Sequence, residues 1–319
     1  DNCSVDNSIV VQLTVNSQTV IQSQPSNMTV CEGGVAFFEV NATPSGLTYQ
    51  WQKDGVNISD LAGKIEGATT SVLVIRNAAT PADVGVYRCI ITGGCNPEIT
   101  NPSSLTVNSY PAAAGAISGL QTICQGDQSV LYVVPVIANA TTYVWDVPYG
   151  STIAGGAGTR TIQVNYSISS TSGVVTVKGQ NGCGDGASSA PLVITVNPLP
   201  TANANIDQII CGTSTTFNAN AVAGTWSILS GDAIITNSAL FNSTVTNLKR
   251  GVNEFVWTVT QGGCTDKDTV NITNATTTVN AGIDQTICST STTLQAITPL
   301  TGATWTVISG SGVISNTSS

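Results

Sequence analysis

The chain has 319 residues, of which only 8% are charged, and its formal net charge is −9. With nine Lys and Arg residues, it has too little positive charge to favour nucleic acid as a partner. The absence of histidine excludes a Ser-His-Asp triad, a Cys-His pair and histidine ligation of a metal. The most apolar run, residues 129–140, contains Pro135 and is too short to span a membrane.

Taken in chain order, the predicted elements are short strands. A period of two, with alternate residues assigned to opposite faces, runs through the segments around Phe38, Trp51 and Leu73, and Gly, Asn, Asp and Pro separate these segments. No segment has the period of an amphipathic helix. Short strands at this spacing predict an all-β fold built from β-sandwiches.

The nine cysteines recur at matching places. Four precede expected strands in similar contexts: Cys31, Cys124, Cys211 and Cys288. Three follow a glycine turn: Cys95, Cys183 and Cys264. This repetition predicts a tandem array of small domains with an oxidised cysteine framework, and hence an extracellular location.

The first complete domain, residues 19–108, resembles an immunoglobulin domain. Trp51 matches the buried tryptophan of strand C, and Tyr87 with Cys89 matches the tyrosine corner and the strand F cysteine. The strand B position that would pair with Cys89 is Val40. We therefore expect Cys89 to be a buried free thiol, and Trp51 and Tyr87 to be core anchors.

The same plan recurs along the rest of the chain. Residues 109–200 form a PKD-like or immunoglobulin-like domain with Trp145 as core anchor, and residues 201–275 form an immunoglobulin-like repeat anchored by Trp226. Residues 276–319 are expected to be a truncated copy of that repeat, in which Trp305 takes the place of Trp226. Residues 1–18 are expected to be the last strand of a preceding domain.

Several short motifs carry a further resemblance: Cys-Glu-Gly at Cys31, Tyr-x-Trp at Trp145, Asn-Gly-Cys at Cys183 and the Val-Asn-Pro-Leu-Pro linker at 196–200. Together they resemble the immunoglobulin-like and PKD-like repeats of giant cell-surface adhesins from gliding Bacteroidota. The resemblance implies secretion by the type IX system and a role in adhesion and gliding motility. It also implies an extended head-to-tail array of domains.

Two disulfide pairings are open. Pairing within domains would join Cys31 to Cys95, Cys124 to Cys183 and Cys211 to Cys264. If Val40 faces Cys89, however, Cys31 lies nine residues back along the strand, about 30 Å from that point, while Cys95 lies at the opposite end of the sandwich. The alternative joins consecutive domains through Cys31–Cys183 and Cys124–Cys264. Cys3 and Cys95 would then face upstream, and Cys211 and Cys288 downstream.

Other chemical signals are weak. The glycine-rich segment 155–160 lacks the ending of a phosphate-binding loop and is typical of a hairpin turn. Asp266 and Asp268 are separated by a lysine, which favours a solvated turn over a calcium site. Asp268-Thr269-Val270 also resembles a Bacteroidota O-glycosylation signal. We expect no catalytic residue, no cofactor and no metal.

The sequence therefore predicts a non-catalytic structural or adhesive segment of a long extracellular surface filament or stalk. Its expected partners are further repeats of the same chain, with cell-surface glycans or abiotic surfaces as candidate ligands. The alternative is a carbohydrate-binding or spacer module of a secreted polysaccharide-degrading enzyme. An aromatic platform on one sandwich face would favour that alternative.

Overall fold

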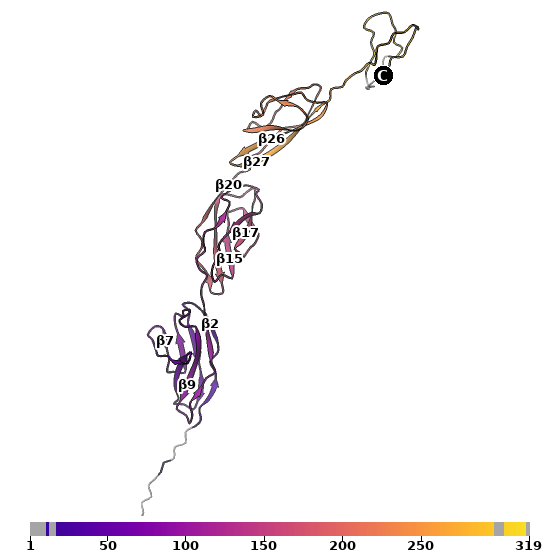
Figure 1. Cartoon of the computed structure of the whole chain (residues 1–319). Helices are drawn as coiled ribbons and strands as arrows, with labels where there is room; N and C mark the ends of the chain where they lie inside the picture. The colour runs from indigo at the N-terminus through magenta and orange to yellow at the C-terminus, as the bar shows by residue number, and fades with distance from the viewer. Residues whose placement is uncertain (1–10, 13–16, 297–302, 317–319) are drawn as a thin grey trace, which may run out of the picture. The chain divides into compact units, whose positions relative to one another are not determined.

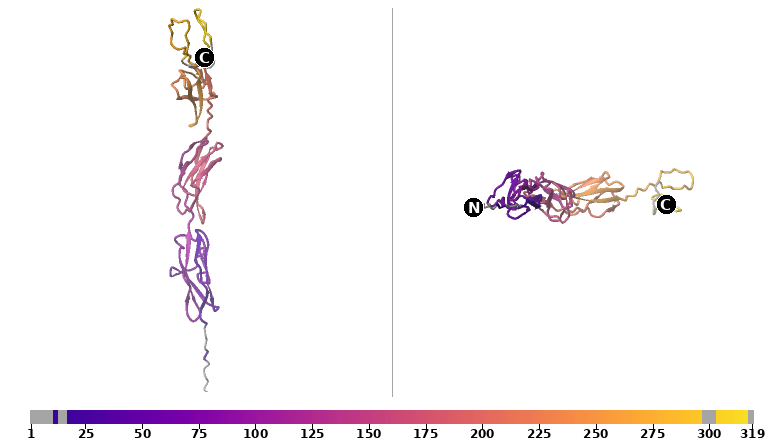
Figure 2. Two further views of the ribbon diagram at one scale, coloured as in Figure 1. Left: turned by 90° about the vertical axis from the view of Figure 1, so that its right-hand side faces the viewer. Right: turned by 90° about the horizontal axis from the view of Figure 1, so that it is seen from below.

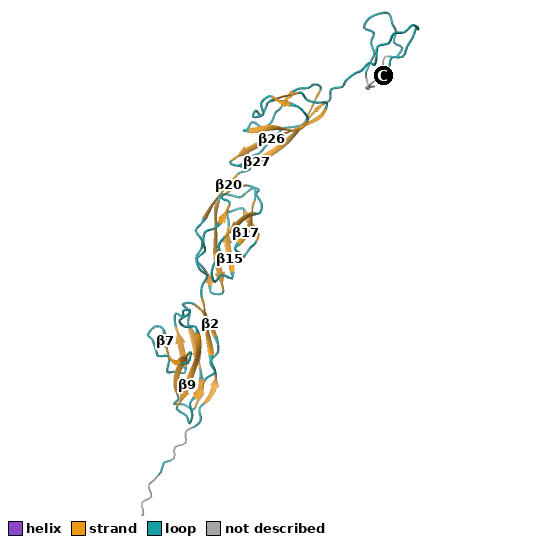
Figure 3. Ribbon diagram, in the orientation of Figure 1, coloured by secondary structure: helices purple, strands orange, loops and turns teal. Residues whose placement is uncertain are grey.

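The computed structural model describes residues 11–12, 17–296 and 303–316, and every regular element in them is a β-strand (Figure 3). The predicted all-β class is therefore confirmed. The chain divides into two compact units, residues 1–122 with 127–196 and residues 123–126 with 197–319. Within the described residues, no helix is long and apolar enough to span a membrane. The predicted strand within residues 1–18 falls mostly outside the described residues.

The first sandwich packs a six-stranded sheet, ordered β2-β11-β9-β5-β6 with β10 on β9, against a three-stranded sheet ordered β3-β8-β7 (Figure 1). A small sheet of β1 and β4 completes it. Its strands are β1 (Val20–Ser23), β2 (Met28–Cys31), β3 (Ala36–Glu39), β4 (Asn41–Thr43), β5 (Thr48–Lys53), β6 (Val56–Asn57), β7 (Ile65–Glu66), β8 (Val72–Ile75), β9 (Gly85–Thr92), β10 (Glu98–Ile99) and β11 (Ser103–Asn108).

The core of the first sandwich follows from the alternation in its strands. Phe38 on β3 is buried while Phe37 beside it is exposed, because successive side chains point to opposite faces of a sheet. The ring of Phe38 stacks on Tyr87, with centroids 4.9 Å apart, and lies 6.1 Å from Trp51. The Tyr87 hydroxyl donates to the backbone oxygen of Asp83 at 2.7 Å, which is the tyrosine corner.

The second sandwich has a four-stranded sheet, ordered β12-β14-β17-β16, and a five-stranded sheet, ordered β13-β20-β18-β15 with β19 on β18. Its strands are β12 (Ser118–Gly119), β13 (Thr122–Cys124), β14 (Val130–Val133), β15 (Thr142–Asp146), β16 (Ser151–Gly155), β17 (Thr161–Tyr166), β18 (Gly173–Asn181), β19 (Gly184–Asp185) and β20 (Leu192–Asn197). The glycine-rich segment 155–160 connects β16 and β17 as a hairpin, as the sequence predicts.

The core of the second sandwich departs from the prediction. Trp145 is only half-buried, with its indole N–H donating to the backbone oxygen of Thr159 at 2.8 Å. The interior is occupied instead by Tyr132 and Tyr166, whose hydroxyl oxygens lie 2.7 Å apart with both rings fully buried. Burial raises the pKa of both phenols, so the pair stays neutral. Tyr132 and Tyr166 therefore occupy the interior position that the sequence predicts for Trp145.

The third sandwich pairs a four-stranded sheet, ordered β21-β27-β26-β23, with a three-stranded sheet, ordered β22-β25-β24. Its strands are β21 (Gln208–Ile210), β22 (Thr215–Thr216), β23 (Gly224–Ser230), β24 (Ile234–Ile235), β25 (Thr244–Thr246), β26 (Gly251–Gln261) and β27 (Cys264–Asn274). Figure 2 gives two further views of all three sandwiches.

Aromatic rings fill the core of the third sandwich. Trp226, the predicted anchor, stacks on Phe217 with centroids 3.9 Å apart, and Trp257 lies 5.2 Å from it. Asn253 is fully buried and satisfied, because its amide group donates to the backbone oxygens of Lys249, Gly251 and Ile272. Its side-chain oxygen accepts from the Lys249 backbone N–H at 3.2 Å.

Residues 276–296 and 303–316 form loops rather than strands (teal in Figure 3). Trp305, predicted as a core anchor by analogy with Trp226, is only half-buried there. The physical reason lies in the third sandwich, whose core draws Phe255, Trp257 and Ile272 from β26 and β27. The described residues 276–296 and 303–316 supply no counterparts of these strands, so among them there is no second layer that covers the tryptophan.

We expect Tyr87→Phe to lower the free energy of unfolding of the first sandwich by about 1–2 kcal/mol. The ring would still stack on Phe38, but the buried oxygen of Asp83 would lose its donor. Urea unfolding followed by hydrogen-exchange mass spectrometry of peptides within residues 48–92 measures the change. The control is Tyr49→Phe, a half-buried tyrosine of β5, and equal effects of the two variants would contradict a structural role for the tyrosine corner.

Candidate functional site

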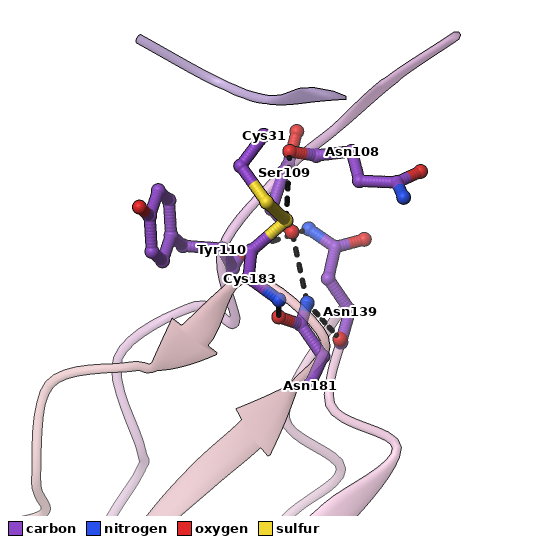
Figure 4. The surroundings of a disulfide bond; sticks show 7 residues. All are labelled: Cys31, Asn108, Ser109, Tyr110, Asn139, Asn181 and Cys183. Atoms are coloured by element: carbon purple, nitrogen blue, oxygen red, sulfur yellow. Dashed lines mark hydrogen bonds between the residues drawn. A yellow bond between two sulfur atoms is a disulfide. The ribbon is translucent and has the colours of Figure 1, made fainter. Parts of the chain in front are cut away.

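The most distinctive site is the disulfide between Cys31 and Cys183, which joins the first sandwich to the second (Figure 4). Cys31 is the last residue of β2, and Cys183 lies in the turn between β18 and β19. Their Cα atoms are 5.6 Å apart. Of the two pairings that the sequence leaves open, the structure has the one between consecutive domains; Cys31 is not bonded to Cys95.

The first partner, Cys31, is positioned by parallel pairing of β2 with β11, the last strand of the same sandwich. Cys31 lies opposite Asn108, and the next backbone N–H, of Glu32, donates to the Asn108 oxygen at 2.9 Å. Because parallel strands end on the same edge, the end of β2 reaches the point where the chain leaves the sandwich. The sequence predicts that Cys31, Cys124 and Cys211 precede strands; they lie ahead of β3, β14 and β22, and each also ends or directly follows a strand.

The second partner, Cys183, is positioned by the side chain of Asn181 (Figure 4). Its oxygen accepts from the Cys183 backbone N–H at 2.8 Å, and its amide group donates to the backbone oxygens of Ser109, at 2.9 Å, and Asn139, at 2.8 Å. The Asn139 side-chain amide in turn donates to the backbone oxygen of Tyr110 at 3.3 Å. One asparagine therefore ties the turn that carries Cys183 to the linker and to a neighbouring loop.

The second disulfide, Cys124–Cys264, repeats this construction with a Cα separation of 5.6 Å. Cys124 ends β13, and the backbone N–H of Gln125 donates to Asn197, the last residue of β20, at 2.9 Å. The Asn197 side chain donates to the Gly262 oxygen at 2.7 Å, beside Cys264. Asn197 thus holds the place that Asn108 has at the first disulfide.

The turn before Cys264 depends on two glycines. Gly262 and Gly263 connect β26 directly to β27, with φ angles of 60° and 86°. A two-residue hairpin with positive φ at both positions has the twist that matches the flanking strands, and glycine adopts it without a steric penalty. This tight turn places Cys264 at the start of β27, where its side chain is buried.

The remaining described cysteines outside the cores lie at positions that can be compared with those of the bonded ones. Cys211 follows β21, which pairs in parallel with β27, so it corresponds to Cys31 and Cys124 and is an exposed thiol. Cys95 lies between β9 and β10, the place that Cys183 has in the second sandwich. Cys288 is an exposed thiol in a loop. Cys3 lies outside the described residues.

Cys89 is a buried thiol in the core of the first sandwich, opposite Trp51 on β5. Burial raises the pKa of this thiol to about 11, so the thiolate is scarce at neutral pH. Its surroundings are those of a small apolar side chain, with Val40 and Ile91 in the same core cluster. The side chain therefore contributes packing rather than chemistry.

Asp266 and Asp268, the two acidic residues considered as a calcium site, accept hydrogen bonds from backbone N–H groups. Asp266 accepts from the Ala202 N–H and Asp268 from the Ala204 N–H, both at 2.8 Å, which fixes residues 202–204 against β27. Within the described ranges there is no group of three His, Cys, Asp or Glu side chains that could hold a metal ion. Sequence reasoning missed Asn181 and Asn197, although each lies next to a cysteine turn or a linker.

The comparisons with known proteins agree with this architecture. Residues 19–92 match the family described as immunoglobulin domain, and residues 110–194 match the family described as PKD-like domain. The chain carries immunoglobulin-like and PKD-like domains in tandem. The search of curated protein sequences finds no relative.

Many solved structures are similar to this chain. The I-band fragment I67–I69 of titin is 13% identical, covering 80% of this chain and 98% of its own, with a TM-score of 0.47. The titin I9–I11 tandem is 16% identical over the same shares, with a TM-score of 0.34. The N-terminal Ig1-2 module of the Drosophila receptor protein tyrosine phosphatase DLAR is 20% identical over 56% of this chain and 98% of its own, with a TM-score of 0.26.

We expect non-reducing peptide mapping of the purified chain to recover crosslinked peptides for Cys31–Cys183 and Cys124–Cys264. Both should disappear after reduction, because each is a single S–S bond between distant segments. Alkylation before digestion prevents exchange with the other thiols. Recovery of a Cys31–Cys95 or Cys124–Cys183 peptide as the main species would overturn this connectivity.

The raised pKa of Cys89 gives a pH dependence with a defined sign. A thiol with a higher pKa in the folded state binds its proton more tightly there, so its contribution to stability is complete below about pH 9. It is then lost as the pH rises toward about 11. We expect Cys89→Ala to flatten the decline in unfolding free energy of the first sandwich over this interval. Parallel curves for the two proteins would show that burial does not perturb this thiol.

Proposed function

We propose that this chain is a structural and adhesive segment of a long extracellular surface filament or stalk. The observation that carries the proposal is the pair of disulfide bonds between consecutive domains. A bond inside a domain mainly raises the stability of that domain, whereas a bond across a linker limits bending and passes tension from one domain to the next. Such bonds persist in oxidising surroundings, which supports an extracellular location.

The surface chemistry supports a passive role. Only 8% of the residues are charged, and histidine is absent. Among the described residues, the fully buried tryptophans are all in sandwich cores, and the exposed aromatic side chains are Phe37, Tyr110 and Tyr149 on three separate elements. These are not arranged as the aromatic platform that a carbohydrate-binding module would need. The stalk function is therefore favoured over an enzyme accessory module.

The finer parts of the proposal come from sequence motifs. The Cys-Glu-Gly, Asn-Gly-Cys and Val-Asn-Pro-Leu-Pro elements support a place among the giant adhesins of gliding Bacteroidota, with export by type IX secretion. In that setting, domains in a head-to-tail line would hold an adhesive tip away from the cell. Many weak contacts along the line, to glycans or abiotic surfaces, would add up through multivalency.

Electron microscopy of the native protein released from the cell surface tests this proposal. We expect thin beaded filaments with a repeat of roughly 35–45 Å, about one sandwich length. Antibodies against this chain should label intact cells without permeabilisation, and cells lacking the gene should attach less well to glass. Compact particles, or labelling only after permeabilisation, would overturn the stalk function.

A further inference from the structure

The two disulfide bonds cross each other in the sequence. Cys124 lies inside the loop closed by Cys31–Cys183, and Cys183 lies inside the loop closed by Cys124–Cys264. The loops span sequence separations of 152 and 140 residues and share the segment from Cys124 to Cys183. Pairing within domains would instead have given separate loops with no shared segment.

We propose that these crossed bonds form a redundant tension shunt, which limits how far the chain can be drawn out and tolerates the loss of either bond. The proposal goes beyond the stalk function, since it concerns the covalent chain and holds whatever the protein is attached to. It depends only on connectivity, because a fully stretched chain is as long as the shortest covalent path between its ends.

That path is short in the oxidised protein. It runs from the N-terminus to Cys31, across to Cys183, back along the chain to Cys124, across to Cys264 and on to the C-terminus. It contains about 145 residues, or about 500 Å of stretched chain, against about 1,100 Å for the reduced protein. The disulfides therefore remove about 600 Å of extension.

The path also decides which strands bear load when the chain is taut. β3–β11 of the first sandwich and β21–β26 of the third lie outside it, in slack loops. On the path are β1, β2, β14–β18 and β27. Tension thus enters the first sandwich only as far as Cys31, and it leaves the third only along β27. Most of these two cores is shielded once the path is tight.

Redundancy follows from the shared segment. Without Cys31–Cys183 the shortest path grows by about 34 residues, or about 120 Å, and without Cys124–Cys264 by about 22 residues, or about 75 Å. Loss of both adds about 174 residues, or about 600 Å. The joint effect is therefore about three times the sum of the separate effects, because each bond alone still bypasses a long loop.

The surroundings of the bonds suggest an order of reduction. In the bond between Cys124 and Cys264 only Cys124 is half-buried and Cys264 is buried, whereas Cys31 and Cys183 are both half-buried. Exchange requires a thiolate to reach a sulfur, so Cys31–Cys183 should react first. A dithiol such as dithiothreitol supplies two electrons and two protons to each bond, releases two protein thiols and closes to its cyclic disulfide. The first reduction lengthens the chain little, and the second releases the stored length.

Single-molecule force spectroscopy of the full chain tests the shunt, with peptide-tag handles at both ends. The reference protein carries Cys3→Ser, Cys95→Ser, Cys211→Ser and Cys288→Ser, so that only the four cysteines of the two bonds remain among those that could affect the path. It is compared with three derivatives. The first also lacks Cys31 and Cys183, the second also lacks Cys124 and Cys264, and the third lacks all four of these cysteines. Mass spectrometry of each protein verifies which bonds are present.

We expect final contour lengths that exceed the reference by about 120, 75 and 600 Å, respectively. Reduction of the reference with dithiothreitol should give the same final length as the fourfold variant. Because the readout is the covalent path at high force, it does not depend on whether a variant regains its native fold. A double variant that already reaches the final length of the fourfold variant would reveal a different pairing of the four cysteines and overturn the proposal, while leaving the stalk function open to its own test.

Discussion

The parallel pairing between an early strand and the last strand of the same sandwich is the interaction on which the disulfide sites depend. In the first sandwich it places Cys31 beside Asn108, and in the third it places β21 against the end of β27. Parallel strands bring a residue from near the start of a domain to the edge from which the chain leaves. A cysteine at that edge can reach the next domain without any insertion or long loop.

Asparagine side chains make many of the hydrogen bonds that fix turns and linkers in this chain. Asn181 and Asn197 anchor the cysteine turns to linkers, and Asn253 satisfies four backbone groups inside the third sandwich. An amide offers both donors and an acceptor, so one side chain can satisfy several backbone groups without carrying charge into a buried site. This chemistry allows ordered junctions in a chain whose charged fraction is only 8%.

Much of the first sandwich could be predicted, because Trp51 and Tyr87 stand in a motif whose spacing specifies both strands and core. The second sandwich was harder, since Tyr132 and Tyr166 compete with Trp145 for the same interior, and side-chain volumes in three dimensions decide between them. The disulfide partners could not be settled by strand register alone. They depend on the path of the linker after Asn108, which the hydrogen bonds of Asn181 determine and local sequence patterns do not encode.

The two layers of the third sandwich differ greatly in extent. β26 and β27 pair along all eleven residues of each strand, whereas β22, β24 and β25 have two, two and three residues. Amide protons in the small layer should therefore exchange with solvent at much lower opening free energies than those of the long hairpin. Cys264 begins β27, in the most persistent part of the domain. The hairpin of β26 and β27 can therefore hold Cys264 in place while the small sheet opposite it opens and closes many times.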